Sequence, residues 1–241
     1  MVRLTYLHSG YTIPLKKLSV LILLFLFHSL NASDTLFMDD FSGNLSQNWI
    51  MFGDPLPRIL DSLGLPPPCF NNNGDSMAGS GVITREVFEI GEGLGIECDM
   101  YLSCDKRGTW VTASLYFITP DYINDRSQSG YTIATLAFSY SGEMDWTSPH
   151  LQGVLTFNCF HDQENKSSIQ LYHQNDMLDG WHRYRMEITE HSMVNYFIDD
   201  SLYCTSTVSV PDTAEHVRIQ LGNRSSVWGI ALHDNLIVYR P

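Results

Sequence analysis

Two acidic residues separated by one position, Glu143 and Asp145, form a pair that could perform acid–base chemistry. Residues i and i+2 of a β-strand point to the same face, so a strand would place both carboxyl groups together. Two carboxyl groups about 5–5.5 Å apart can cleave a glycosidic bond, one as nucleophile and one as acid and base. The flanking residues 139–142 and 148–149 are rich in serine, glycine and proline, which favours a solvated loop instead. We therefore assign no catalytic residue and keep these two as weak candidates.

Aromatic side chains offer a second kind of chemistry, because a flat ring can stack on the apolar side of a sugar. Trp110 and Tyr116 alternate with small polar residues along one predicted strand, opposite an apolar face of residues 111, 113, 115 and 117. The apolar face is expected to line the core and the other to be exposed. The predicted ligand-binding residues are Tyr101, Trp110, Tyr116 and Trp146, with Asp99, Asn158 and His161 as polar partners. The alternative is that these rings serve core packing, and we expect Trp49, Trp181 and Trp228 in the core or at its rim.

Histidine and cysteine form no recognised metal or nucleophile motif. The sequence contains no H-x-H, H-E-x-x-H, C-x-x-C, G-x-S-x-G or phosphate-binding loop, which argues against zinc, redox and serine-hydrolase chemistry. The five cysteines are Cys69, Cys98, Cys104, Cys159 and Cys204. We expect them to be small buried residues. One disulfide between two of them is the alternative that the sequence leaves undecided.

Residues 1–32 have the pattern of a secretory signal peptide. They hold Arg3, Lys16 and Lys17 and no acid, then the apolar run 18–27, and end on the small residue Ala32. The run is about half of the ~20 residues that a membrane-spanning helix needs. The protein is thus predicted to be secreted, periplasmic or extracellular, with no membrane span after signal removal. Retention of the segment as an anchor is the alternative.

The charge balance argues against nucleic acid as a partner. The chain of 241 residues has 27 acidic and 14 basic residues and a net charge of −13, and three of the basic residues lie in the signal segment. A phosphate backbone is bound by clustered Lys and Arg, which are absent here. An acidic chain suits neutral ligands or divalent cations better.

Alternation of apolar and polar residues dominates the sequence after residue 33. The predicted strands are 95–103, 110–118, 131–140, 154–160, 182–189, 194–198, 217–221 and 236–239. Segment 54–75 contains five prolines and is predicted to be a long loop. Strands recur at regular intervals, and the amino-acid composition does not change along this segment. Residues 33–241 are therefore predicted to form one all-β domain, a sandwich or barrel.

Three motifs along the chain resemble one superfamily. They are Leu36-Phe37-Met38-Asp39-Asp40-Phe41-Ser42-Gly43-x-Leu45-x-x-x-Trp49, the hairpin from Gly180-Trp181-His182-x-Tyr184 to Tyr196-Phe197-Ile198-Asp199-Asp200, and Gly229-x-Ala231-x-His233-Asp234-Asn235-Leu236-x-Val238-Tyr239. Together they resemble the concanavalin A-like lectin/glucanase superfamily, including its laminin-G-like members. The resemblance implies a jelly roll, a two-sheet antiparallel β-sandwich that holds carbohydrate on a sheet face or rim loops.

The segment around Glu143 is distantly similar to the catalytic strand of glycoside hydrolase family 16, which reads E-x-D-x-x-E or E-x-D-x-E. The third acid would fall at Thr147 or Ser148, and neither is acidic. The resemblance therefore lacks the expected proton donor.

The resemblance also implies a structural calcium ion between the N-terminal segment and the last strand. Asp40 and Asp234 stand at those places, with backbone carbonyls from residues 73–75 as further ligands. The alternative is that both aspartates accept hydrogen bonds from backbone amides.

The sequence thus predicts a secreted, non-catalytic, lectin-like domain that binds glycan. A family 16 glycoside hydrolase that uses Glu143 and Asp145 is one alternative. A structural or protein-recognition domain is the other.

Overall fold

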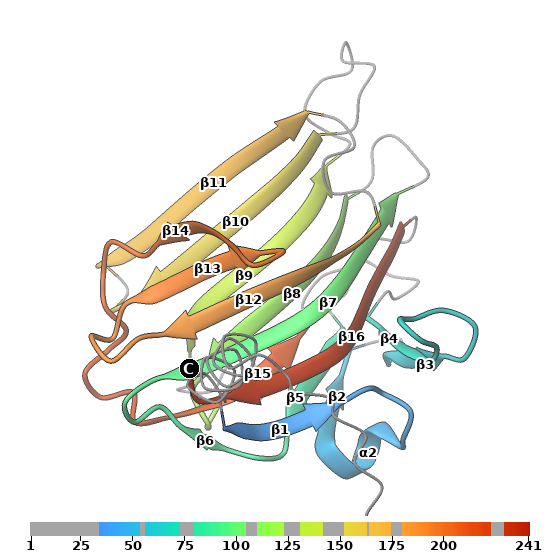
Figure 1. Ribbon diagram of the computed structural model, residues 1–241, viewed down its shortest axis with the longest axis horizontal. Helices are drawn as coiled ribbons and strands as arrows, with labels where there is room; N and C mark the ends of the chain where they lie inside the picture. Colours follow the sequence, from blue (N-terminus) through green and yellow to red (C-terminus); the bar gives the residue numbers. More distant parts are fainter. Residues whose placement is uncertain are drawn as a thin grey trace, which may run out of the picture. The chain divides into compact units, whose positions relative to one another are not determined.

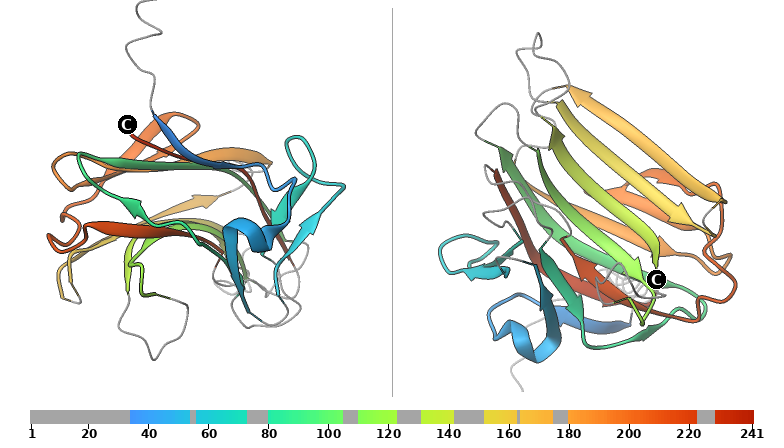
Figure 2. Two further views of the ribbon diagram at one scale, coloured as in Figure 1. Left: turned by 90° about the horizontal axis from the view of Figure 1, so that it is seen from below. Right: turned by 180° about the vertical axis from the view of Figure 1, so that it is seen from behind.

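The alternating pattern folds into two antiparallel sheets that pack as the layers of a sandwich, as Figure 1 and Figure 2 show. The computed structural model describes residues 34–53, 56–72, 80–104, 110–122, 131–141, 152–162, 164–174, 180–222 and 229–241. Thr35–Pro241 form one compact unit, and Met1–Asp34, nearly all outside the described residues, form another. Within the described ranges, no helix has the length and apolar character needed to cross a membrane. The predicted all-β sandwich is confirmed.

We name each sheet after its central strand. The β7 sheet contains β1 (Thr35–Asp39), β3 (Arg58–Leu60), β4 (Cys69–Asn71), β7 (Leu94–Cys104), β12 (Trp181–Ile188), β13 (Val194–Ile198), β14 (Ser201–Thr205) and β16 (Gly229–Tyr239). Its strand order is β14-β13-β12-β7-β16-β4-β3, and β1 pairs with β16.

The β8 sheet contains β2 (Trp49–Phe52), β5 (Gly81–Thr84), β6 (Phe88–Glu89), β8 (Trp110–Ile118), β9 (Thr132–Ser141), β10 (Gln152–Phe160), β11 (Lys166–Gln174) and β15 (His216–Leu221). Its strand order is β11-β10-β9-β8-β15-β5-β2, and β6 pairs with β15. One short helix, α2 (Leu45–Asn48), precedes β2.

The core lies between the sheets and is formed by the apolar side of each central strand. Ile96 and Met100 of β7 are buried against the same cluster as Ala113, Leu115 and Phe117 of β8. Complete burial of a large apolar side chain stabilises the fold by about 1.5–3 kcal/mol. The predicted core face of residues 113, 115 and 117 is confirmed.

The N-terminal motif is explained by one carboxylate. Asp39 accepts a hydrogen bond from the indole Nε1 of Trp49 at 2.7 Å and another from the backbone N–H of Phe41 at 2.7 Å. The fully buried Trp49 ring stacks on Phe41, with ring centroids 5.9 Å apart. These contacts hold β1, the turn after it and β2 together, which accounts for an aspartate and a tryptophan ten positions apart. The predicted core position of Trp49 is confirmed.

The predicted late hairpin is formed by β12 and β13. Tyr184, Met186 and Ile188 point inward and are buried. The turn that follows β13 and leads into β14 contains Asp199 and Asp200 at φ 48° and 63°. Positive φ at both central residues is the geometry of a two-residue hairpin turn, and aspartate tolerates it better than most residues.

Local signals were misleading in the proline-rich segment. The predicted loop 54–75 contains β3 and β4, and Phe70 of β4 is fully buried opposite His233 of β16. Pairing with β16, whose residues are 161 and 163 positions away in the sequence, overrides the local preference for a loop. The sequence analysis also did not predict six further strands, namely β1, β2, β5, β6, β11 and β14.

Four cysteines have described side chains, and all four are free thiols. Cys69, Cys98 and Cys159 are buried as predicted, whereas Cys204 is half-buried. Burial raises the pKa of the Cys69 thiol to about 12 and that of Cys159 to about 11, so both thiols are protonated at neutral pH. The side chain of Cys104 lies outside the described residues.

Candidate functional site

The predicted ligand-binding residues do not share one surface. Tyr101 points to the outward face of the β7 sheet, where its ring contacts that of Trp181 with centroids 5.7 Å apart. Tyr116 points to the outward face of the β8 sheet. These two faces lie on opposite sides of the sandwich (Figure 2). The prediction of a common binding face is therefore wrong, because alternation fixes the face of a residue on its strand but not the sheet that the strand joins.

Several predicted site residues lie beyond what the structure describes. Trp110 begins β8, but its side chain is outside the described set. Trp146, Glu143 and Asp145 fall within residues 142–151, which are likewise outside it. These assignments stay predictions, as does the signal peptide at residues 1–32.

Trp181 is an aromatic residue that the predicted ligand-binding set left out. We expected it in the core or at its rim, and it is half-buried on the outward face of the β7 sheet beside Tyr101. The sequence did indicate this outward position. Residues an odd number of positions apart on a strand point to opposite faces, and Trp181 is three positions before the inward-pointing Tyr184.

The outward surface of β8, β9, β10 and β15 is rich in hydroxyl and amide groups, and we call it the hydroxyl face. Its members are Thr112, Ser114, Tyr116, Thr135, Ala137, Ser139, Thr156, Asn158 and Gln220. Strand register places Ser114, Ala137 and Thr156 in one row across three strands. The hydroxyl oxygens of Thr112 and Ser139 share a hydrogen bond of 2.8 Å in the next row. The described part of this face is thus mainly polar and carries no carboxylate, with Arg218 of β15 as a cation beside Gln220.

Tyr116 contributes less open surface than predicted. It is 8% exposed and packs in a small apolar cluster with Ile83 and Ile118. The prediction that it presents an exposed ring for stacking is wrong, because β5 lies two strands away and brings Ile83 beside it. Among the described side chains, this face offers a ligand mainly hydrogen-bonding groups.

Carboxylates are distributed unevenly between the two sheets. The sequences of β2, β5, β8, β9, β10, β11 and β15 contain no Asp or Glu, and Glu89 of β6 is the one acid in a strand of the β8 sheet. Strand acids gather instead in the β7 sheet, at Asp39, Glu97, Asp99, Glu187 and Asp234. Among the described strands, the hydroxyl face therefore has no pair of carboxylates for glycosidic cleavage, while Glu143 and Asp145 lie outside the described residues.

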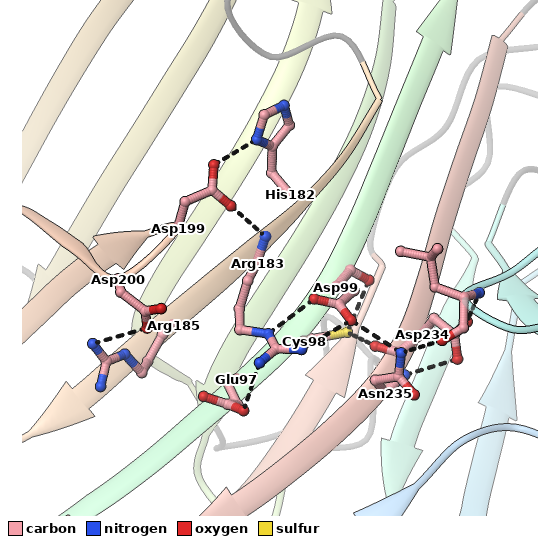
Figure 3. Close-up of polar contacts among 11 residues, drawn as sticks. Glu97, Cys98, Asp99, His182, Arg183, Arg185, Asp199, Asp200, Asp234 and Asn235 are labelled. Carbon is pink, nitrogen blue, oxygen red and sulfur yellow. Dashed lines mark hydrogen bonds and ion pairs between the residues drawn. The ribbon is translucent and has the colours of Figure 1, made fainter.

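The β7 sheet does hold an E-x-D pair that the sequence reasoning missed, Glu97 and Asp99. Figure 3 shows both beside Arg183, whose Nε and Nη2 donate to the two carboxylate oxygens of Asp99 at 3.0 and 3.3 Å. The side-chain amide of Asn235 donates to Asp99 at 3.0 Å as well. Burial raises the pKa of Glu97, while the hydrogen bonds that Arg183 donates to Asp99 raise the pKa of Arg183. A carboxylate held by three donors is structural, since its oxygens are not free to attack a substrate.

The two predicted calcium ligands both bond backbone amides. Asp40 is exposed and accepts from the N–H of Ser42 at 3.0 Å, and these bonds to Ser42 lower the pKa of Asp40. Asp234 is fully buried and accepts from the N–H groups of Leu65 and Asn235. Burial raises the pKa of Asp234, and repulsion from Asp99 and Asp40 adds to the increase.

The part of the chain that the structure describes contains no group of three His, Cys, Asp or Glu side chains arranged to hold a metal ion. Residues 73–75, predicted to add carbonyl ligands, are outside that part. The calcium site stays a prediction.

Neither a family model nor a curated protein sequence matches the chain. Solved structures do match. A β-glucanase from Bacillus licheniformis is 13% identical, with 88% of this chain and 100% of that chain covered and a TM-score of 0.52. A glycoside hydrolase family 16 endo-glucanase from Bacteroides ovatus is 12% identical over 84% and 99% of the two chains, with a TM-score of 0.55. An endo-β-1,4-glucuronan lyase from Trichoderma reesei is 9% identical over 86% and 96%, with a TM-score of 0.54.

These similarities cover the whole sandwich, and the shared feature is the arrangement of two antiparallel sheets. A fold hosts different reactions, as a glucanase and a lyase illustrate. Together with the strand order and the packing of the core, they show that this chain has the concanavalin A-like jelly-roll fold.

Proposed function

We propose that this protein is exported and binds a neutral polysaccharide at the hydroxyl face without cleaving it. The observation that carries the proposal is the composition of the β8 sheet. Its outward face carries rows of hydroxyl and amide side chains, of which Thr112, Ser139, Thr156 and Asn158 are half-buried. Within their described bounds its seven main strands contain no Asp or Glu. Such groups suit hydrogen bonds to sugar hydroxyls, whereas cleavage requires two carboxyl groups.

The names of the similar structures support carbohydrate as the ligand class. Two are glucanases and one is a lyase of glucuronan, an acidic polymer. The net charge of −13 favours a neutral glycan over an acidic one, because like charges repel at long range. Because the sequence identities are 13% or less, these names support a carbohydrate ligand only by analogy between proteins of similar fold.

The test is retention of the protein on a panel of immobilised neutral polysaccharides, with a reducing-end assay on every polysaccharide that retains it. We expect retention without release of sugar. Asn158→Ala removes an amide from the hydroxyl face and should weaken binding about tenfold, the equivalent of one hydrogen bond. The matched control is Asn195→Ala, a half-buried asparagine on the outward face of the β7 sheet, which should bind like the wild type.

Three outcomes would contradict the proposal. Equal effects of Asn158→Ala and Asn195→Ala would move the site away from the hydroxyl face. Release of sugar that is lost in Glu143→Gln but kept in Glu97→Gln would show a hydrolase that uses Glu143. Failure of the wild type to bind any of the polysaccharides would favour a structural or protein-recognition role.

We further propose that Asp40 and Asp234 hold a calcium ion. Each carboxylate repels the other, which a divalent cation would relieve, and each oxygen that accepts one amide keeps a second lone pair. Calcium at about a hundredfold excess over its Kd should raise Tm by roughly 5 °C relative to EGTA.

Asp40→Asn should abolish that increase in Tm, while Asp121→Asn, an exposed acid in another loop, should retain it. An unchanged Tm in EGTA would support backbone hydrogen bonding as the whole role of the two carboxylates.

A further inference from the structure

The outward face of the β7 sheet carries an aromatic pair that the proposed function does not use, Tyr101 and Trp181. The two residues are register partners on β7 and β12, and their ring centroids are 5.7 Å apart with the ring planes inclined by 40°. Rings in contact at this distance form one continuous apolar patch. Both residues are half-buried, so part of each is open to solvent.

Each ring of the pair also has a polar atom that is left for a ligand. Among the described residues, the hydroxyl of Tyr101 and the indole N–H of Trp181 have no hydrogen-bond partner. Solvent reaches both atoms, since neither is one of the buried polar atoms that lack a partner. The indole N–H of the buried Trp49, by contrast, donates to Asp39. The pair therefore combines apolar rings with free polar ends, as binding surfaces rich in Tyr and Trp do.

The neighbouring row of the same face is an ion pair that is held in place. Arg183 and Asp99 each lie two positions from a member of the aromatic pair and are themselves register partners. Figure 3 shows Nε of Arg183 donating to Asp99 at 3.0 Å. The Arg183 side chain is still 46% exposed, so its outer N–H groups can donate to a ligand. A side chain that is already fixed loses little conformational entropy when a ligand binds.

The charges around the aromatic pair favour a neutral ligand. Three carboxylates lie near Arg183: Asp99, Glu97 at 3.8 Å from Nη1, and Asp199, which accepts from the backbone N–H of Arg183 at 3.0 Å. An anionic ligand would be repelled by this excess of negative charge. The apolar side of a sugar ring can stack on the two aromatic rings, while its hydroxyls bond the free polar ends and Arg183.

We propose that Tyr101 and Trp181 form a second carbohydrate-binding site, which takes a neutral sugar chain on the side of the sandwich opposite the hydroxyl face. The two sites lie on different sheets and share no residue (Figure 2). The class of ligand rests on the proposed function, whereas the place of this site does not. With one site on each side, the protein is bivalent and holds two polysaccharide chains together.

Trp181→Ala tests the second site by calorimetry with a neutral β-glucan oligosaccharide. We expect the wild type to bind two oligosaccharides per chain and Trp181→Ala to bind one, with the affinity of the altered site reduced at least about tenfold. Trp181→Phe keeps an aromatic ring and should retain the second site with a smaller loss. The urea midpoint of each variant shows whether it folds like the wild type.

Phe197→Ala is the matched control. Phe197 is also a half-buried aromatic residue on the outward face of the β7 sheet, but the guanidinium of Arg185 lies 4.0 Å from its ring centroid and covers one side of the ring. Its register partner Arg185 is four positions from Trp181 along β12, so Phe197 is not part of the aromatic pair. Phe197→Ala should therefore bind two oligosaccharides, as the wild type does.

The possible failures are distinguishable. If Trp181→Ala binds with the stoichiometry and affinity of the wild type, the second site is overturned and the hydroxyl face stands. If binding is lost in Trp181→Ala and unchanged in Asn158→Ala, the aromatic pair is the site and the hydroxyl face is overturned. Equal losses in Trp181→Ala and Phe197→Ala would overturn the aromatic pair as a specific site. A wild type that binds no neutral oligosaccharide would overturn both proposals.

Discussion

Gly81→Ala is expected to lower the free energy of unfolding by about 3 kcal/mol. Gly81 begins β5, and a Cβ there would overlap the carbonyl oxygen of Leu221 and lie 2.9 Å from that of Gly222. It would also lie 2.7 Å from Cζ of Phe52. A phenyl ring can rotate away, but the two carbonyls belong to backbone that is fixed by strand pairing between β5 and β15. The sheet must therefore separate locally.

Gly43→Ala is the matched control for this clash, since a Cβ at Gly43 would meet no atom within 4 Å. Its free energy of unfolding should stay within about 0.5 kcal/mol of the wild type. Urea unfolding monitored by tryptophan fluorescence measures both variants. Equal stabilities of the two would show that β5 does not approach the end of β15 as closely as the structure has it.

Trp49→Ala should cost about 4 kcal/mol, at the upper end of single substitutions. The indole is fully buried, stacks on Phe41 and is edge-on to Phe37 with centroids 6.0 Å apart. Its removal leaves a cavity between β1 and β2 and leaves Asp39 without the N–H of Trp49. Aromatic-to-alanine changes at such sites lose both transfer free energy and packing.

Trp49→Phe separates the two contributions. Phenylalanine keeps most of the ring contacts but has no donor for Asp39, so a loss of about 1–2 kcal/mol is expected. Thermal or urea unfolding of both variants gives the comparison. If Phe and Ala cost the same, the hydrogen bond to Asp39 and not the packing would account for the role of Trp49.

Local patterns determined the strands and several of their details. Alternation with period 2 placed Leu115 and Phe117 inward, and Tyr184 and Met186 likewise, because a pleated strand alternates its side chains whatever it pairs with. The turn at residues 199–200 was also predicted, since aspartate tolerates positive φ. These features depend on neighbours within a few positions, which a sequence displays directly.

Sheet membership was decided only by the tertiary structure. Tyr101 and Tyr116 are fifteen positions apart and both point outward, yet β7 and β8 belong to different sheets, so the two rings lie on opposite sides of the molecule. Pairing of β7 with β12 and β16 involves residues about 80 to 140 positions away. No local pattern records such a choice.

The two clusters of polar side chains also form only through pairing between distant strands. Asp99, Arg183 and Asn235 meet across three strands of one sheet, and Asn72, Ser114 and Gln220 meet around Gly222. Each side chain is ordinary in its own segment, and only long-range pairing makes it buried, paired or unpaired. The sequence by itself therefore determined the central strands, their inward faces and the resemblance to a jelly roll. The tertiary structure decided the shorter strands and which polar groups share a surface, because both depend on pairings between distant strands.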